Sequence, residues 1–440
     1  MHTKSALRTQ LASLALIPLL TLTAQTRGTD PFQRFHLPDG IQLVVWHVED
    51  APRQSTFTFL PLGLASDRAQ CAQYSHLVEH MIIRSTDPEA LKIEGIQFNG
   101  ETSSGALRIE SYAQPDKWQA SLERHLRWLQ LDEVDAEVLK REKGRIQSEE
   151  RSTVGLGYTH KWAEAGWNQV VRHGLPHASV HGDVVKAVAA DVMTYAKRAL
   201  SRHDQILIAS VGPIDPIELR DFLAHELAEL SKGEEPQAAV REASSIAKLE
   251  HVSKQATWDL AAQHYMEWMP LPDETPSDRI AGGIVVQLLN MGLYGDKSIQ
   301  AGKALASVVV VPEGRYLMLS ANLTGADQVE QASESFKRAL QGISKGATIP
   351  LPMALMQAKY QATAKLDPKA FRKQLAALNR DLSLIEAQML LTAIVNERLL
   401  GMNFDEIVSA WEPIDVKWME AYLERLEKLG PPSSLLLQPK

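Results

Sequence analysis

The segment Cys71–Thr86, CAQYSHLVEHMIIRST, carries two histidines four residues apart, with a glutamate directly before the second. An α-helix turns about 100° per residue, so His76 and His80 would share one face, with Glu79 beside them. The remaining positions of this helix are mostly apolar, namely Leu77, Val78, Met81 and Ile82. Because buried imidazoles and carboxylates are unfavourable without a partner, the pattern predicts a helix that binds a metal ion.

A catalytic zinc ion usually takes three protein ligands and leaves a fourth position open for water. His76 and His80 can supply two of them, and we expect a carboxylate from another element as the third. The charged segment 135–152 offers Glu142, Glu149 and Glu150. Glu142 and Glu149 fall almost in line on one helical face, so one could bind the metal while the other supports the site from behind.

Glu79 neighbours both histidines without needing to bind the metal itself. A carboxylate beside a metal-activated water can take its proton and so generate a nucleophile near neutral pH. This is the chemistry of amide hydrolysis, and Glu79 is therefore the expected general base of a hydrolytic enzyme.

The segments around this helix predict a mixture of strands and helices. Strands are expected at 34–50 (two strands around the Pro-Asp-Gly turn), 55–66, 105–114 and 203–215, and helices at 115–131 and 135–152. Trp118 and Trp128 are expected in the core. The fold class is therefore α+β.

The chain also shows signs of an internal repeat. The segment 231–248 loses its apolar periodicity and is interpreted as a linker, and VVKAVAADVMTYAKRAL (184–200) resembles IVSAWEPIDVKWMEAYLERL (407–426). We expect two homologous units, each a mainly antiparallel β-sheet packed with α-helices. The expected divisions are a signal peptide at 1–24, a metal-binding peptidase domain at 25–230, the linker, and a metal-free domain at 249–440.

The N-terminus is typical of an exported protein. Lys4 and Arg8 precede an apolar segment at 11–24 that is too short for a comfortable membrane span, and cleavage after Ala24 is expected. The predicted location is the periplasm, with anchoring to the inner membrane by an uncleaved N-terminus as the alternative. We expect no stable membrane insertion. The net charge of −8 gives no electrostatic argument for nucleic acid, and the single cysteine excludes an intrachain disulfide.

The order H-x-x-E-H inverts the common zinc-protease motif, and the chain resembles the pitrilysin/insulysin family of zinc metallopeptidases, the inverzincins, which includes the mitochondrial processing peptidases. The resemblance covers most of residues 34–215 and is weak beyond 248. The matching segments are LPDGIQLVV (37–45), HLVEHMII (76–83), FNGETSSG (98–105), EKGRIQSE (142–149) and HGLPHASVHGDVVKAVAADV (173–192).

The resemblance implies a zinc metalloendopeptidase, or oligopeptidase, that hydrolyses peptides or unfolded polypeptide segments within a closed chamber. It assigns the roles of the site residues by position. His76, His80 and Glu149 would bind one Zn²⁺ per chain, with Glu150 as the rival third ligand. Glu79 would be the general base and Glu142 the acid that supports the site. Asn99 and Gly100 stand at the family's Asn-Ala and would bind the substrate as a strand added to the sheet edge.

The C-terminal half departs from the pattern of active family members. It has no H-x-x-E-H, and 277–292, where a second metal helix would fall, contains no histidine. Active members of the family usually carry an arginine and a tyrosine, seven residues apart, in a C-terminal unit, where the pair binds the substrate. In this chain Gln300 and Ser307 align with that pair. We therefore expect the metal-bearing subunit of a heterodimer whose homologous partner supplies this pair, with a homodimer as the alternative. The alternative function is that of a catalytically inactive structural or assembly subunit of the same fold.

Overall fold

A computed structural model describes most of the chain. The described residues are 32–63, 67, 71, 73–84, 93–103, 106–131, 134–151, 184–230, 253–258, 263–295, 304–311, 314–344, 351–353, 355, 356, 358, 390, 391, 394, 395, 397 and 401–439. The expected signal peptide, the expected linker and Gln300 lie outside these residues.

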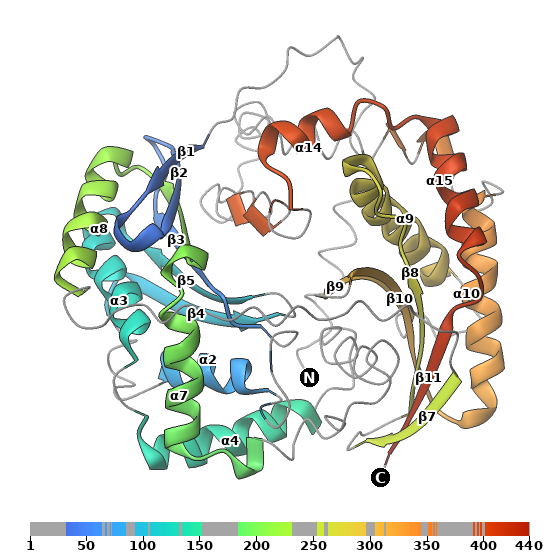
Figure 1. Ribbon diagram of the computed structural model, residues 1–440, viewed down its shortest axis with the longest axis horizontal. Coiled ribbons are helices and arrows are strands. Elements are labelled where there is room, and N and C mark those ends of the chain that lie inside the picture. The colour runs from blue at the N-terminus through green and yellow to red at the C-terminus, as the bar shows by residue number, and fades with distance from the viewer. Residues whose placement is uncertain are drawn as a thin grey trace.

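The described residues form two sheets packed with helices, which confirms the predicted α+β class (Figure 1). The first sheet contains β1 (Gln33–His36), β2 (Gln42–His47), β3 (Gln54–Leu60), β4 (Ile96–Thr102), β5 (Leu107–Ala113) and β6 (Leu207–Gly212). Its strand order is β1-β2-β6-β3-β5-β4, and only the β2–β6 pair is parallel. As predicted, the sheet is mainly antiparallel, and β4 is one of its edges.

Helices pack against one face of this sheet and form its main core. They are α2 (Tyr74–Arg84), α3 (Trp118–Gln130), α4 (Ala136–Arg151), α7 (Ala189–Leu200) and α8 (Pro216–Leu230), with short 3-10 turns at η1 (Pro38–Gly40), η4 (Pro115–Lys117) and η7 (His203–Gln205). In α3 the apolar side chains at helical spacing turn toward the sheet, so Trp118, Leu122 and Leu126 are buried. Trp128 is buried as well, which confirms the prediction for both tryptophans.

The second sheet contains β7 (Ser253–Trp258), β8 (Gln263–Pro270), β9 (Ala304–Val311), β10 (Gly314–Leu323) and β11 (Ser433–Pro439). Its order is β7-β11-β8-β10-β9, with only the β7–β11 pair parallel. The helices of this unit are α9 (Pro276–Gly295), α10 (Val329–Ser344), α14 (Phe404–Ala410) and α15 (Val416–Lys428), with a 3-10 turn at η8 (Ala326–Gln328). Figure 1 shows the two units side by side.

The two units share one topology. The order β2-β6-β3-β5-β4 corresponds strand by strand, with the same directions, to β7-β11-β8-β10-β9. The two segments that resemble each other in sequence contain α7 and α15, and each helix precedes the last strand of its unit. α9 stands between β8 and β9 as α2 stands between β3 and β4, so the second unit has a helix in the place of α2 but no histidine on it.

The second unit also contacts the other face of the first sheet. Leu390, Leu391 and Ile394 are buried in a cluster with Trp46, Phe57 and other residues of β2, β3 and β6. Beside this cluster, Arg34 on β1 forms a two-pronged ion pair with Glu397, with nitrogen–oxygen distances of 2.8 and 3.2 Å. None of the helices in the described part of the chain is both long and apolar enough to cross a membrane.

Candidate metal centre

The helix α2 presents its two histidines at the border between core and solvent. Four of its apolar side chains, Leu77, Val78, Met81 and Ile82, are at most 1% exposed and fix the helix against the sheet and α7. His76 therefore lies half-buried and His80 buried on the adjacent face, where α4 passes. The two imidazole rings are 4.8 Å apart between centroids and nearly perpendicular, at 84°.

The helix α4 brings two glutamates to this face. Its buried stripe is Leu139, Glu142 and Ile146, at helical spacing, so the Glu142 side chain is enclosed in an otherwise apolar row. Glu149 lies on the same side of the helix, nearer its end, and its side chain is 41% exposed. Glu142 thus reaches the histidines from within the core, and Glu149 reaches them from the solvent side.

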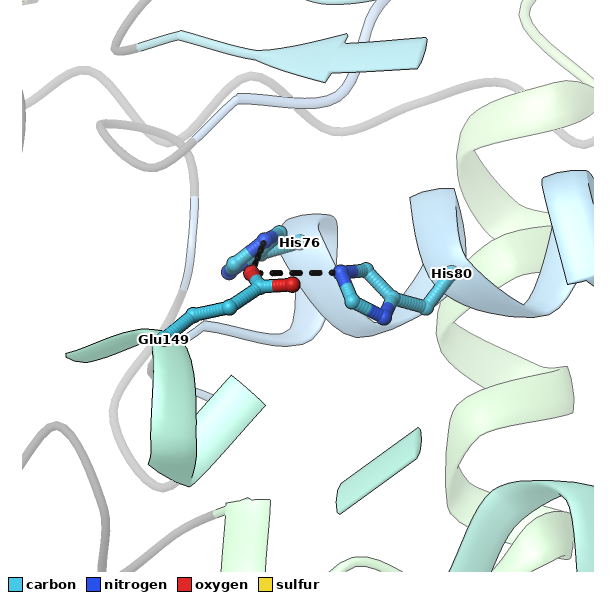
Figure 2. Close-up of side chains that lie close together, drawn as sticks. All are labelled: His76, His80 and Glu149. Carbon is cyan, nitrogen blue, oxygen red and sulfur yellow. Dashed lines mark ion pairs between the residues drawn. The ribbon is translucent and has the colours of Figure 1, made fainter. Parts of the chain in front are cut away.

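Three side chains converge at one point, as Figure 2 shows. Glu149 Oε2 lies 3.5 Å from His76 Nε2 and 3.6 Å from His80 Nε2, and one ligand atom from each residue lies within 4.8 Å of the others. Zinc bonds of about 2.0–2.2 Å in a tetrahedral arrangement place neighbouring ligand atoms roughly 3.4 Å apart. The spacing and the two-histidine, one-carboxylate donor set therefore fit a zinc ion.

Each imidazole has a hydrogen-bond partner on its other nitrogen. Gln73 Oε1 lies 3.1 Å from His76 Nδ1, and Glu142 Oε2 lies 3.1 Å from His80 Nδ1. With Nδ1 donating to these oxygens, each Nε2 keeps its lone pair for a metal. Both histidines are thus oriented toward the same point as Glu149.

Two arginines of α4 compensate the buried charge of Glu142. Arg145 Nη1 lies 2.7 Å and Arg141 Nε 3.1 Å from Glu142 Oε1, on the oxygen that does not contact His80. Burial by itself would raise the pKa of Glu142, but the hydrogen bonds from His80, Arg141 and Arg145 hold it below its ordinary value. Glu142 therefore remains an anionic acceptor for His80.

The same proximity shifts the protonation of the ligand groups when no metal is bound. Hydrogen bonds from His76 and His80 hold the pKa of Glu149 well below its usual range. Burial alone would lower the pKa of His80, yet hydrogen bonds and charge interactions with Glu149, Glu79 and Glu142 raise it. In the absence of metal, a proton on His80 therefore stabilises the cluster of carboxylates.

Glu79 is held separately by the edge strand β4. Thr102 Oγ1 donates a hydrogen bond of 2.6 Å to Glu79 Oε2. Gly100 lies directly beneath the same side chain, because a Cβ atom there would be 2.9 Å from Glu79 Cγ and 3.0 Å from Ile83 Cγ1. The absence of a side chain at position 100 thus allows the strand to approach the general base predicted from the sequence.

The neighbouring residue of β4 faces the other side of the sheet. Asn99 pairs with Glu110 across the β4–β5 ladder, and its Nδ2 donates to Glu110 Oε1 at 2.8 Å. Arg108 links Glu110 and Glu101 on that side, at 3.3 and 2.6 Å. Asn99 and Gly100 therefore lie next to each other on an edge strand, but only Gly100 is on the side of the sheet that faces α2 and Glu79.

A buried carboxylate fixes the start of α2. Asp67 Oδ1 accepts hydrogen bonds from Ser75 N at 3.1 Å, from Ser75 Oγ at 2.6 Å and from the Tyr195 hydroxyl of α7. Burial raises the pKa of Asp67 to about 7, although these hydrogen bonds and one from the Gln73 backbone oppose the shift. The turn before His76 is thus tied to α7 through a single side chain.

The structure brings together the residues that the sequence singled out on α2 and α4, namely His76, His80, Glu149, Glu142 and Glu79. The carboxylate nearest both histidines is that of Glu149, while the side chain of Glu150 lies outside the described part. Ser307 lies half-buried on the edge strand β9.

The sequence reasoning missed Gln73, Thr102, Arg145 and Asp67. Of these four residues, only Thr102 could have been predicted from the sequence. It lies two residues after Gly100, and strand alternation therefore places it on the same side of β4.

No family model matches the sequence, and no curated protein matches it. Solved structures match over nearly the whole chain. One is an M16-like peptidase from Alicyclobacillus acidocaldarius, with a TM-score of 0.66 and 11% identity over 94% of this chain and 100% of that chain. Another is a peptidase M16 inactive domain from Pseudomonas fluorescens, with a TM-score of 0.64 and 13% identity over 93% and 98% of the two chains.

A third similar structure is the periplasmic protease PqqL from Escherichia coli, with a TM-score of 0.62 and 16% identity over 95% of this chain. The match covers 48% of PqqL, so the chain spans about half the length of that protein. These comparisons show that the chain has the fold of M16-type peptidases, and they confirm the resemblance drawn from the sequence at the level of the fold. Since one neighbour is an inactive domain, activity has to be argued from the site.

Proposed function

We propose that the protein is a zinc-dependent peptidase that hydrolyses peptides or unfolded polypeptide segments. The observation that carries this proposal is the convergence of His76 Nε2, His80 Nε2 and Glu149 Oε2 beside Glu79. A metal-storage site or a scaffold has no need of a carboxylate next to the ligands, held by Thr102 and not itself part of the ligand cluster.

The donor set fits zinc, with His76, His80 and Glu149 as ligands of one ion per chain. When bound, zinc would lower the pKa of a water molecule and polarise the carbonyl under attack. Glu79 would accept the proton of the attacking water and deliver it to the leaving amine. Glu142 would hold the His80 imidazole in the orientation that leaves Nε2 free.

The substrate would bind as an additional strand along β4. This strand is the last in its sheet, and its side away from β5 has no strand partner among the described residues. A peptide paired there would pass Gly100 and lie close to Glu79, so its backbone would be positioned by main-chain hydrogen bonds. Such binding selects extended segments rather than folded proteins.

The test is to compare the wild type with Glu79→Gln for bound zinc and for cleavage of a mixture of unstructured peptides. We expect about one zinc per chain in both proteins and a loss of activity of roughly 10²–10⁴-fold in the variant. Glu137→Gln, at an exposed position of α4, is the matched control and should leave both properties unchanged. Measurable cleavage that is equal in the wild type and Glu79→Gln would refute the proposal, and so would the absence of cleavage by the wild type when its partner subunit is present.

The same proposal includes a chamber built from two chains. The second unit carries no H-x-x-E-H, and the positions that align with the family's arginine and tyrosine hold Gln300 and Ser307, so a second chain of similar fold would supply that pair. We propose a heterodimer in the periplasm whose other subunit contributes the arginine and tyrosine that Gln300 and Ser307 replace. Full activity of the purified chain as a monomer or homodimer would refute this part.

The alternative function is that of a structural subunit, and the inactive-domain neighbour is the observation in its favour. A structural subunit would show no cleavage even with its partner present. The zinc measurement separates the two cases further, since a subunit without catalytic function has no reason to bind zinc stoichiometrically.

A further inference from the structure

We propose that Gln73 is a positioning residue that fixes which nitrogen of His76 faces the metal. The inference rests on the proposed zinc site and extends it to a residue that contacts neither metal nor substrate. Its starting point is the contact of 3.1 Å between Gln73 Oε1 and His76 Nδ1.

Gln73 has an unusual backbone for its residue type. Its φ is +65°, and among the described residues it is the only non-glycine in the left-handed region of backbone conformation. This left-handed conformation is unfavourable for any side chain with a Cβ and is normally left to glycine or asparagine. Gln73 therefore adopts a backbone conformation against the local preference of its residue type, which points to a use for its side chain.

The surrounding structure holds this conformation in place. Gln73 is fully buried, and its carbonyl accepts the hydrogen bond from Leu77 N that begins α2, at 2.9 Å. Its backbone also hydrogen-bonds to Asp67, which is tied to Ser75 and Tyr195. The side chain has little freedom to move, so the amide remains in contact with His76.

The chemistry of the contact decides the tautomer of His76. The amide of Gln73 presents Oε1 to His76, and because this atom can only accept a hydrogen bond, the contact in this orientation requires a proton on His76 Nδ1. The lone pair then lies on Nε2, the atom that faces Glu149 at 3.5 Å. A histidine that binds zinc through Nε2 needs this tautomer, and the partner of its other nitrogen commonly changes metal affinity by 10–100-fold.

The Nδ1 atoms of the two histidines have different hydrogen-bond partners. His80 has the carboxylate of Glu142 behind it, whereas His76 has a neutral amide, so the site gains orientation at His76 without a second buried negative charge. If Gln73 were only a turn residue, glycine would serve at least as well, and the loss of the amide would not change metal binding.

The experiment measures zinc affinity by competition with a chromophoric chelator for the wild type, Gln73→Met and Gln73→Glu in the full chain. Methionine keeps the length of the side chain and removes the acceptor, so we expect a 10–100-fold loss of affinity. Glutamate restores an acceptor and should bring the affinity to within about threefold of the wild type or above it. Gln42→Met, at an exposed position of β2, is the control and should bind zinc as the wild type does.

A second readout separates positioning from a merely structural role. In the zinc-bound wild type, histidine-selective ¹⁵N NMR should show a protected Nδ1 proton on His76, and this signal should be lost in Gln73→Met. If that variant does not fold, Gln73→Gly takes its place, because glycine adopts the left-handed conformation without strain.

Unchanged affinity in the methionine or glycine variant would overturn the inference, and so would an equal loss with glutamate and methionine. A wild type that binds no zinc would refute the proposed function as well. A wild type that binds zinc, with variants that bind it equally well, would refute only the role of Gln73.

Discussion

Glu142 holds His80 from behind, with Oε2 3.1 Å from Nδ1, and it does so from a position with no exposed surface in the stripe between Leu139 and Ile146. The carboxylate stands in line with apolar core residues of α4, so its contact with His80 is part of how this helix packs. The orientation of His80, a proposed zinc ligand, thus depends on the packing of the core of the first unit.

Glu142→Ala should weaken zinc binding by roughly 10–100-fold, because His80 loses the acceptor that fixes its tautomer and ring orientation. Glu142→Gln keeps an acceptor and should retain more affinity than Glu142→Ala. The measurement is competition with a chelator at neutral pH. Glu137→Ala, on the exposed side of the same helix, is the control, and equal affinity in all four proteins would show that Glu142 has no such role.

Zinc affinity should rise with pH and then level off. In the metal-free protein, Glu149 and its neighbours raise the pKa of His80, so this imidazole holds a proton that the metal must displace. Below that raised pKa, binding releases a proton and tightens by up to about tenfold per pH unit; above it the dependence disappears. Calorimetry in buffers of different ionisation enthalpy counts the protons, and binding without proton release near pH 6 would contradict the expectation.

Thr102→Val should lower kcat by about 10–100-fold while zinc content stays at the wild-type level. The variant keeps the shape of the side chain and removes the hydrogen bond to the Glu79 carboxylate, and hydrogen bonds to charged groups contribute about 1.5–3 kcal/mol. Thr102→Ser should recover most of the activity. The same valine substitution at Thr257, exposed on β7, should have no effect, and a similar loss there would rule out a specific role for Thr102.

His125 should contribute to unfolding of the protein in acid. It is fully buried between Thr58 Oγ1 and Ser111 Oγ, and burial lowers its pKa to about 3. Because the unfolded chain binds the proton more readily, His125 favours the folded state above pH 6.5, and this stabilisation, of the order of 5 kcal/mol at most, is lost as pH falls toward 3.

His125→Leu should therefore lower the free energy of unfolding at pH 7 by about 1–3 kcal/mol, since Thr58 and Ser111 lose a partner. It should also make that free energy less dependent on pH between 6 and 4. Denaturant titrations over this range provide the test, with His36→Leu at an exposed position as control. An unchanged pH slope would show that His125 does not titrate as described.

Leu390→Ala should destabilise the protein by about 2–5 kcal/mol, because the side chain is fully buried against the first sheet. Met353→Ala, at a side chain that is 55% exposed, should change the stability by less than about 0.5 kcal/mol. Chemical denaturation measures both. A neutral Leu390→Ala would show that the second unit does not depend on this contact.

Much of the fold could be predicted from the sequence because the residue patterns that indicate its helices and strands are local. The spacing of apolar residues in α2 and α3 indicates both helices, and the alternation in β5 indicates a strand. The proximity of His76, His80 and Glu149 could be predicted for the same reason, since the spacings His76–His80 and Glu142–Glu149 each lie within one helix. The second unit's copy of the topology was indicated by the loss of apolar periodicity at 231–248 and by the similarity of the segments that contain α7 and α15.

The features that could not be predicted depend on contacts between segments that are distant in the sequence. Gln73 acquires its role from a backbone conformation that no residue pattern around it indicates, and Thr102 acquires its role from the approach of β4 to α2. Arg34 and Glu397 are 363 positions apart and are paired only because Leu390, Ile394 and Glu397 lie against the first sheet. Such contacts follow from tertiary structure and leave no periodic trace in the chain.

The burial of Leu390, Leu391 and Ile394 against Trp46 and Phe57 means that the boundary between the units in sequence is not a boundary in space. A chain truncated near residue 230 would keep every residue of the metal centre yet expose an aromatic surface to solvent. Such a fragment should aggregate or require detergent, whereas the two halves produced together as separate polypeptides should copurify.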